Sequence, residues 1–363
     1  MLRKLAFSNI SAVYVGIALI ILFSIWIPHT FLTSATLTTL LSEQAITGII
    51  AVALVLPFAA GAFDLSFAYN VGFGAILSAS LVGNHGFPVW LTIVVVLAVC
   101  GAVGAVNGFF ATVIGINPVI VTLAVGSCLS AGINWVSGGN EIIGLSSGFT
   151  GLANDQLLGI ALPVYYLLAI ALVAWYVLEH TPPGRRLYAV GGNVEAARLA
   201  GVRTGLVVFT SLALVGVASG LAGVLVSSQV GAGDPSVGPA YLLPAFAGIF
   251  LGSTQVQPGR FNVWGTLISV YVLAIGVKGL QLAGAPFWLP DMFNGLALLI
   301  AVGISQRAHV ASVITSMRRL RPATASVEGA QPDAATAAVD GNFSEGRASS
   351  VADAGGGGVN TPT

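Results

Sequence analysis

Charged residues are scarce in this chain. Asp, Glu, Lys and Arg make up 7% of its 363 residues, and the thirteen Lys and Arg balance the thirteen Asp and Glu. A neutral chain lacks the basic surface that nucleic acids require, so we exclude a nucleic-acid partner. Hydrophobic residues account for 56% of the chain, with a mean hydropathy of +0.93. No soluble fold could bury that much apolar surface, and the composition predicts an all-α, polytopic membrane protein embedded in lipid.

Residues for enzyme chemistry are equally scarce. The two cysteines, Cys100 and Cys128, lie inside apolar runs, and we interpret them as small buried side chains and not as a disulfide or metal pair. The chain has no phosphate loop of the form GxxxxGK[ST], no metal-spaced His and Cys cluster and no nucleophile elbow. We therefore expect no enzyme activity and no catalytic, metal or cofactor-binding residue, and any energy from ATP must come from another subunit.

Long apolar runs recur along the chain and predict about ten membrane spans. Asp64 in the third region and two prolines, Pro239 and Pro244, in the eighth predict broken or re-entrant helices there. Paired glycines at a spacing of four, such as Gly104 with Gly108 and Gly216 with Gly220, predict close helix contacts, although glycine is common in membrane helices generally. The expected spans are 10–27, 43–61, 67–83, 89–113, 118–136, 160–178, 206–229, 239–252, 263–282 and 291–306.

The basic residues predict the orientation. With ten spans both termini share one side, and twelve of the thirteen Lys and Arg fall on that side, Lys278 being the exception within a span. The positive-inside rule makes this side cytoplasmic. We expect a permease domain over 1–309, containing a cytoplasmic loop over 179–205, followed by a disordered cytoplasmic tail over 321–363 that is too poor in apolar residues to fold.

One polar island, Pro182–Thr204, interrupts the apolar sequence and carries five charged residues. Asn193 is a suitable N-cap for a short helix, and Gly201 can end that helix in a left-handed conformation. Glu195 would lie near the positive end of the helix dipole with Arg198 one turn later. A helix of two turns is not stable alone, so we expect it to dock on a partner.

Polar side chains within the apolar runs are the candidates for a substrate pathway, because such groups are costly in hydrocarbon. Each also has a structural interpretation. Asp64 can cap the third span together with Ser66, the asparagines can bond between helices, and Lys278 can extend toward the membrane interface. Asp64 and Lys278 each stand alone in their segments, which disfavours an ion-coupled transporter. The candidate pathway residues are Asp64, Asn70, Asn107, Asn134, Lys278 and Asn294.

Several segments resemble the permeases of bacterial sugar importers of the ribose, xylose and galactose type, within the wider branched-chain amino-acid/sugar permease superfamily. The island sequence GGNVEAARLAGVRT is similar to the family signature GGNxEAAxxxGI, and GAFDLSFAYNVGFGA resembles GGIDLSVGSVLA. The segment GDPSVGPAYLLPAFAGIFLGST resembles DPxxGxGYELxAIAAxxxGGT. With two further matches the resemblance covers roughly Ser42 to Ser305.

The resemblance implies a non-catalytic permease subunit of an ATP-binding-cassette importer in the bacterial inner membrane. Its partners would be an ATPase subunit with two nucleotide-binding domains that carries ATP and Mg²⁺, a secreted binding protein that delivers a monosaccharide, and a second permease copy in a homodimer or heterodimer. The short helix would dock in a groove of the ATPase. The coupling residues implied by the signature are Gly191, Gly192, Asn193, Glu195, Ala196, Ala197 and Gly201, together with Arg198.

Other functions fit part of the sequence. A branched-chain amino-acid or nucleoside permease is the nearest alternative to a sugar permease. A secondary transporter or channel would explain ten spans, and a purely structural membrane anchor would leave the island without a role.

Overall fold

Most of the computed structural model, which describes residues 11–303, is helical. The predicted tail over 321–363 and several of the basic residues used to orient the chain lie outside the described residues. Each of the ten predicted spans contains a helix. The elements are α1 Ser11–Trp26, α2 Pro28–Phe31, α3 Ser34–Ala59, α4 Phe67–Ala79, the π-helical turn η3 Ser80–Asn84, α5 Val89–Phe109, the π-helical turn η4 Phe110–Ile114, α6 Pro118–Ser137, α7 Ser147–Asn154, the short antiparallel strands β1 Gln156–Leu157 and β2 Ile160–Ala161, α8 Leu162–His180, α9 Pro182–Gly192, α10 Val194–Leu199, α11 Thr204–Val230, the 3₁₀ turn η5 Gly238–Tyr241, α12 Leu242–Gly252, α13 Val263–Leu282 and a last helix, Leu289–Gly303.

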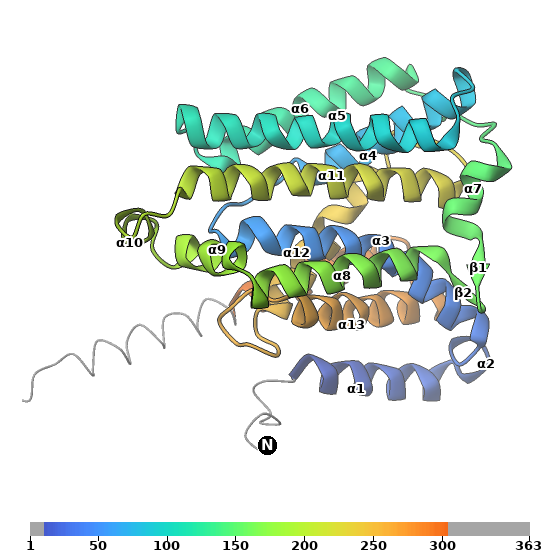
Figure 1. Cartoon of the computed structure of the whole chain (residues 1–363). Coiled ribbons are helices and arrows are strands. Elements are labelled where there is room, and N and C mark those ends of the chain that lie inside the picture. The colour runs from blue at the N-terminus through green and yellow to red at the C-terminus, as the bar shows by residue number, and fades with distance from the viewer. Residues whose placement is uncertain (1–10, 304–363) are drawn as a thin grey trace, which may run out of the picture. The chain divides into compact units, whose positions relative to one another are not determined.

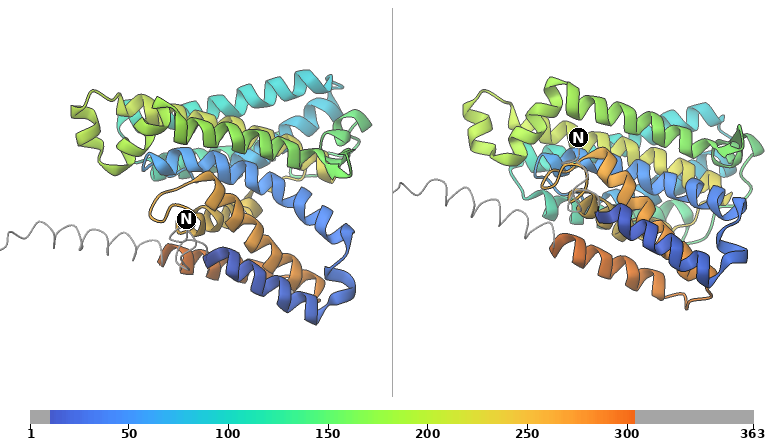
Figure 2. Two further views of the ribbon diagram at one scale, coloured as in Figure 1. Left: turned by 60° about the horizontal axis from the view of Figure 1, so that its bottom comes forward. Right: turned by 90° about the horizontal axis from the view of Figure 1, so that it is seen from below.

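Six of these helices are long and apolar enough to cross a membrane, and three shorter apolar helices, including α1 and the last helix, accompany them within the described residues. The prediction of an all-α polytopic membrane bundle is confirmed. The count of ten spans stays a prediction, because the remaining segments are shorter than a full span. Figure 2 shows the last helix (orange) on the same side of the bundle as α1 (dark blue).

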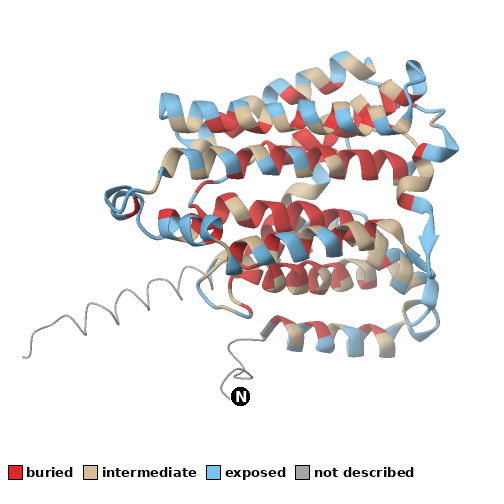
Figure 3. Cartoon of the chain, viewed as in Figure 1, coloured by how far each residue is buried: buried red, intermediate tan, exposed pale blue. Residues whose placement is uncertain are grey.

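Two long helices, α3 and α11, form the centre of the bundle (Figure 1). Helix α11 packs against α5 and α4, whereas α3 packs against α8 and α13. The buried residues concentrate on these central helices (Figure 3), and nearly every residue of α3 between Ala45 and Val55 is buried. A helix that is apolar on all sides is suited to such a position, since it has neighbours all round.

Glycines allow the backbones of α5 and α11 to touch. A Cβ on Gly104 would overlap the carbonyl of Leu212, and one on Gly216 would overlap the carbonyl of Cys100. The predicted close packing through these glycines is therefore confirmed. The prediction for Cys128 is wrong: Cys100 is buried at this contact, but Cys128 is exposed on α6, because it lies on the side of that helix away from the bundle.

A six-residue pattern occurs twice, each time directly after one of the central helices. Residues 61–66 read GAFDLS after α3, and residues 231–236 read GAGDPS after α11. The first glycine of each copy is left-handed, with φ of +77° at Gly61 and +76° at Gly231. In each copy the aspartate Oδ1 accepts hydrogen bonds from the backbone N–H and hydroxyl of the serine two residues later, at 2.7–2.8 Å.

The two turns lie at opposite ends of the bundle. Helix α3 ends beside α9, whereas α11 begins just after α10 and runs away from it (Figure 1). The short segments that follow the turns, α4 and η5, then meet, with Gly238 packed on the backbone of Ala68 and near Gly72. The predicted breaks near Asp64 and Pro239 are therefore confirmed. They form a pair in which the preceding helices, α3 and α11, run in opposite directions, a relation that the sequence analysis did not predict.

Replacement of Gly216 by alanine tests the backbone contact between α5 and α11. The added Cβ would overlap the Cys100 carbonyl, so we expect the free energy of unfolding to fall by about 1–3 kcal/mol. The matched control is Gly295→Ala, because Gly295 lies in a helix with open space around it. Thermal unfolding of both purified variants in detergent measures the difference, and equal midpoints would contradict the contact.

Candidate functional site

The polar island folds into two helices, α9 and α10, that project from one end of the bundle (Figure 1). The predicted caps of α10 are confirmed. The Asn193 side-chain oxygen accepts a hydrogen bond from the Ala196 N–H at 2.9 Å, and Gly201 adopts a φ of +81°. Helix α9 was missed, although the pair Pro182 and Pro183 at its first turn was a usable signal, since proline favours that position.

Helix α10 exposes almost its whole surface. Among the predicted coupling residues only Ala197 is buried, and the side chains of Glu195 and Arg198 form an exposed pair at 4.0 Å. Leu199 is 89% exposed and Val194 is half exposed. The sequence analysis did not single out Leu199, which with Val194 adds apolar area to the exposed charged surface of α10.

Helix α9 is anchored to the end of α3 through a backbone contact. A Cβ on Gly191 would overlap the carbonyl of Ala59, whereas one on Gly192 would meet open space. Leu187 and Val190 of α9 are buried in the same core as α3. Gly191 is therefore required for packing, and Gly192 belongs to the free surface.

A second anchor joins α9 to the loop before α13. The Tyr188 hydroxyl donates a hydrogen bond to the Phe261 carbonyl at 2.7 Å, and the Arg260 guanidinium lies 3.5 Å from the centre of the Tyr188 ring. Arg260 also pairs with Glu179 at the end of α8, at 3.7 Å. Burial raises the pKa of the Tyr188 phenol, and the Arg260 charge opposes that rise. The island thus contacts both halves of the chain.

Three of the predicted pathway residues lie together among α4, α5 and α11. Asp64 caps α4 through Ser66, and the Asn107 amide donates to the Ser66 hydroxyl at 2.7 Å. The Asn70 amide donates to backbone carbonyls of α5 and α11, at 3.2 and 3.3 Å. These bonds satisfy irregular backbone and join helices, which supports the structural interpretation of this group. Asn134 lies apart from this group, because it is exposed on α6 and its amide donates a hydrogen bond to the Ser130 carbonyl of its own helix.

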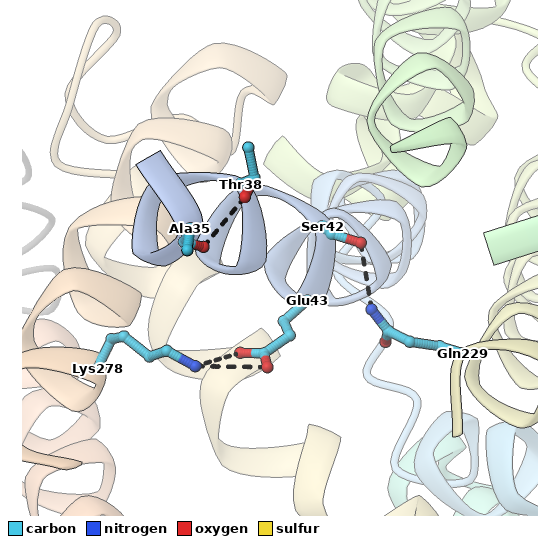
Figure 4. A network of polar contacts seen from close by, with 6 residues as sticks. All are labelled: Ala35, Thr38, Ser42, Glu43, Gln229 and Lys278. Atoms are coloured by element: carbon cyan, nitrogen blue, oxygen red, sulfur yellow. Dashed lines mark hydrogen bonds and ion pairs between the residues drawn. The ribbon is translucent and has the colours of Figure 1, made fainter. Parts of the chain in front are cut away.

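The other two predicted residues lie at a cavity near the end of the bundle away from α10. The cavity has a volume of about 330 Å³ and is lined by residues of α3, α11, the 237–244 segment, α13 and the last helix, Asn294 among them. Lys278 lies beside it and forms an ion pair with Glu43 of α3, with distances of 3.1 and 3.4 Å from Nζ to the two carboxylate oxygens (Figure 4). Lys278 is alone within its own helix, as predicted, but its charge has a partner, Glu43, on another helix.

Glu43 and several amide side chains at this cavity were missed by the sequence reading. The available signal was Glu43 followed by Gln44 at the start of an apolar run, an unusual pair in a segment that is otherwise hydrophobic. Gln229, which donates a hydrogen bond to the Ser42 hydroxyl at 3.2 Å, gave a similar signal near the end of α11 (Figure 4).

Comparison with known proteins places this architecture in a family. Residues 36–302 match the family model described as "Branched-chain amino acid transport system / permease component". The "Autoinducer 2 import system permease protein LsrD" of Salmonella paratyphi B is 27% identical over 283 residues, covering 76% of this chain and 85% of that protein. The proteins of the same name from Photorhabdus laumondii and Yersinia enterocolitica are each 28% identical, over 261 and 281 residues, covering 70% and 76% of this chain and 78% and 85% of those proteins.

No solved structure matches the chain. The family match spans well over half of its residues, and the helical membrane architecture agrees with it. The chain therefore belongs to the family of permease components of branched-chain amino-acid transport systems, as the membrane-embedded, non-catalytic permease subunit of an ATP-binding-cassette importer whose ATP is hydrolysed by a separate subunit.

Proposed function

We propose that this permease imports a monosaccharide and that α9 and α10 receive the motion of the ATPase. The observation that carries the proposal is the contrast between the two helices: α10 is exposed, whereas α9 is built into the bundle through Gly191 and Tyr188. A lever needs a free surface for the motor and a rigid attachment to the load. The arrangement supplies both within one short segment.

The docking surface combines an apolar contact with a charged pair. Leu199 and Val194 offer apolar area that a groove on the ATPase would remove from water, and Glu195 and Arg198 offer charges of both signs for orientation. The proposed coupling residues are those of the sequence analysis with Leu199 added. Binding of ATP and Mg²⁺ to the partner would then bias the permease between two states through this contact.

The choice of a monosaccharide rests on two observations. The segments around Asp64, Asn193 and Asp234 resemble sugar permeases, and the relatives are named as components of an autoinducer 2 import system. The family model is named after branched-chain amino acids, which are the alternative substrates together with nucleosides. Because the chain belongs to an importer family, we no longer consider a secondary transporter or a structural anchor.

The proposed assembly follows the same logic. The α10 end would face the cytoplasm, with both termini on that side, in the inner membrane of a bacterium. A secreted binding protein would deliver the sugar to the opposite end, near Glu43 and Gln229. A second permease copy, identical or related, would complete the membrane pore, and lipid would cover the remaining apolar faces such as that of Trp135.

Exchange of Leu199 for serine, or of Glu195 for alanine, tests the docking surface. We expect each change to lower co-purification of the ATPase and ATP-driven uptake by about tenfold or more, as at interface hot spots, without altering the thermal midpoint of the permease. The matched control is Leu158→Ser, because Leu158 is equally exposed but lies at the opposite end of the bundle. Normal ATPase retention in the Leu199 variant would contradict the assignment.

The adjacent glycines at the end of α9 separate attachment from docking. Gly191→Ala pushes a methyl group against the Ala59 carbonyl, so we expect uptake to fall several-fold while the ATPase stays bound and still hydrolyses ATP. Gly192→Ala adds the same methyl group in open space and should leave both activities unchanged. The ratio of substrate imported to ATP hydrolysed, measured in membrane vesicles, distinguishes the two. Equal ratios would show that the contact with α3 does not transmit force.

Uptake of labelled solutes by cells with and without the gene tests the substrate class. We expect gene-dependent uptake of at least one of D-ribose, D-xylose and D-galactose and none of L-leucine or uridine. Uptake that is confined to L-leucine or uridine would replace the sugar assignment with one of the two alternatives. The ATPase-docking tests above do not depend on which solute is carried.

A further inference from the structure

Two polar contacts meet α3 at the end of the bundle away from α10. Lys278 of α13 pairs with Glu43, and Gln229 of α11 bonds to Ser42, the preceding residue (Figure 4). Glu43 lies nine residues, or about 14 Å, after the start of α3. It is sixteen residues before Ala59, the end of α3 that contacts α9. Neither contact touches the coupling segment.

We propose that the cavity lined by Glu43 binds a neutral polyhydroxylated solute on its way through the permease, and that the carboxylates of Glu43 and Asp291 exclude anions from it. The inference deepens the proposed function, since it names the site at which the imported sugar is contacted. Its volume of about 330 Å³ lies at the lower end of the range of about 300–1,000 Å³ found for small-molecule sites, which suits a solute of monosaccharide size.

Polar side chains line the cavity. Asn294 is only 7% exposed and makes no side-chain hydrogen bond within the described residues. Gln44, Tyr241 and Gln281 also line the cavity, and Gln281 is exposed. The Asn294 amide is not sealed from solvent, so what fills the cavity supplies its hydrogen bonds, and a solute that carries both donors and acceptors can replace water there. Hydroxyl groups do both.

The charges around the cavity favour a neutral solute. Glu43 and Asp291 are its charged lining residues, and no Lys, Arg or His lines it within the described residues. Lys278 does not line the cavity, and Glu43 neutralises its charge. A sugar phosphate would therefore bring an anion next to carboxylates with no lining cation to receive it. The Glu43 oxygens keep lone pairs for hydroxyl donors, because a carboxylate accepts about four hydrogen bonds.

The broken helix explains why the cavity is here. Val237, Ala240, Tyr241 and Pro244, which belong to the irregular segment after α11 and the start of α12, form one of its walls. Non-helical backbone at membrane depth is tolerated where it lines a cavity, and interrupted helices in paired repeats mark binding sites in other transporters. A second cavity of about 410 Å³ shares Glu43 and Gln229 and is also lined by Asn154 at the end of α7 and Gln156 of β1, which gives a polar route toward the surface.

Protection of an introduced cysteine tests occupancy directly. Val277 lines the cavity, so Val277→Cys in a Cys128→Ser background reports on it, since Cys100 is buried. The assay uses membrane vesicles that hold the full chain. The probe is whichever of D-ribose, D-xylose and D-galactose the cells take up, at millimolar concentration. We expect it to slow alkylation of the introduced cysteine by N-ethylmaleimide at least about threefold. L-Leucine and ribose 5-phosphate should give no protection. The matched control is the unsubstituted chain, in which Cys128, exposed on α6, should react at the same rate with and without sugar.

Side-chain variants test the same cavity through transport. Loss of the Asn294 amide in Asn294→Leu, or of the Glu43 charge in Glu43→Gln, should lower uptake by about fivefold or more, as expected for one lost hydrogen bond, and should remove the protection of Val277→Cys. The comparison variant is Ser127→Leu on the exposed face of α6, which should transport normally. If Asn294→Leu does not fold, the Glu43→Gln variant and the protection assay still decide.

The outcomes separate this inference from the proposed function. Uptake that is lost in Leu199→Ser and Gly191→Ala but unchanged in Asn294→Leu and Glu43→Gln would keep the importer assignment and overturn the cavity. Equal protection by L-leucine would overturn the polyhydroxylated class, and equal protection by ribose 5-phosphate would overturn the neutral class. Sugar-dependent protection that disappears in the Asn294 variant would support both the site and its chemistry.

Discussion

Backbone polar groups in a membrane must find partners within the protein, and this requirement shapes the whole chain. Helices satisfy it along most of the sequence. At the two points where the central helices end, at opposite ends of the bundle, a left-handed glycine and an aspartate that accepts two hydrogen bonds replace the helical pattern. At the first of these points, the Leu65 N–H, left free by the turn, is met by the Thr122 hydroxyl at 3.1 Å. The short helices that follow, and with them the polar cavity, depend on these two turns.

Features that are local in sequence were predictable. The cap at Asn193 and the end at Gly201 need only neighbouring residues, so the position of α10 followed from the sequence alone. Apolar runs of about twenty residues likewise predicted the helices, because length and composition decide whether a segment can cross a membrane. The repeated turn was also visible in the sequence, as GAFDLS and GAGDPS, but its meaning depends on the opposite directions of α3 and α11.

Contacts between distant residues were not predictable from one sequence. Lys278 and Glu43 are separated by 235 positions, and only the packing of α13 on α3 brings them together. The same is true of Tyr188 and Phe261, and it explains why the attachment of α9 was missed while its charged neighbour was found. Polar residues in apolar runs thus indicated that interior contacts exist without showing which of them join helices and which line a cavity.

The contact between α4 and η5 restricts which substitutions the chain can accept during evolution. Gly238 lies against the backbone of α4, where an added Cβ would overlap the carbonyl of Ala68, and Gly72 lies close to it. A smaller neighbouring side chain could not make room at Gly238, because the obstacle is backbone. A substitution in η5 is therefore tolerated only if it still packs against α4, and the reverse also holds. The two copies of the turn and the segments after them must stay compatible in shape even where their sequences differ.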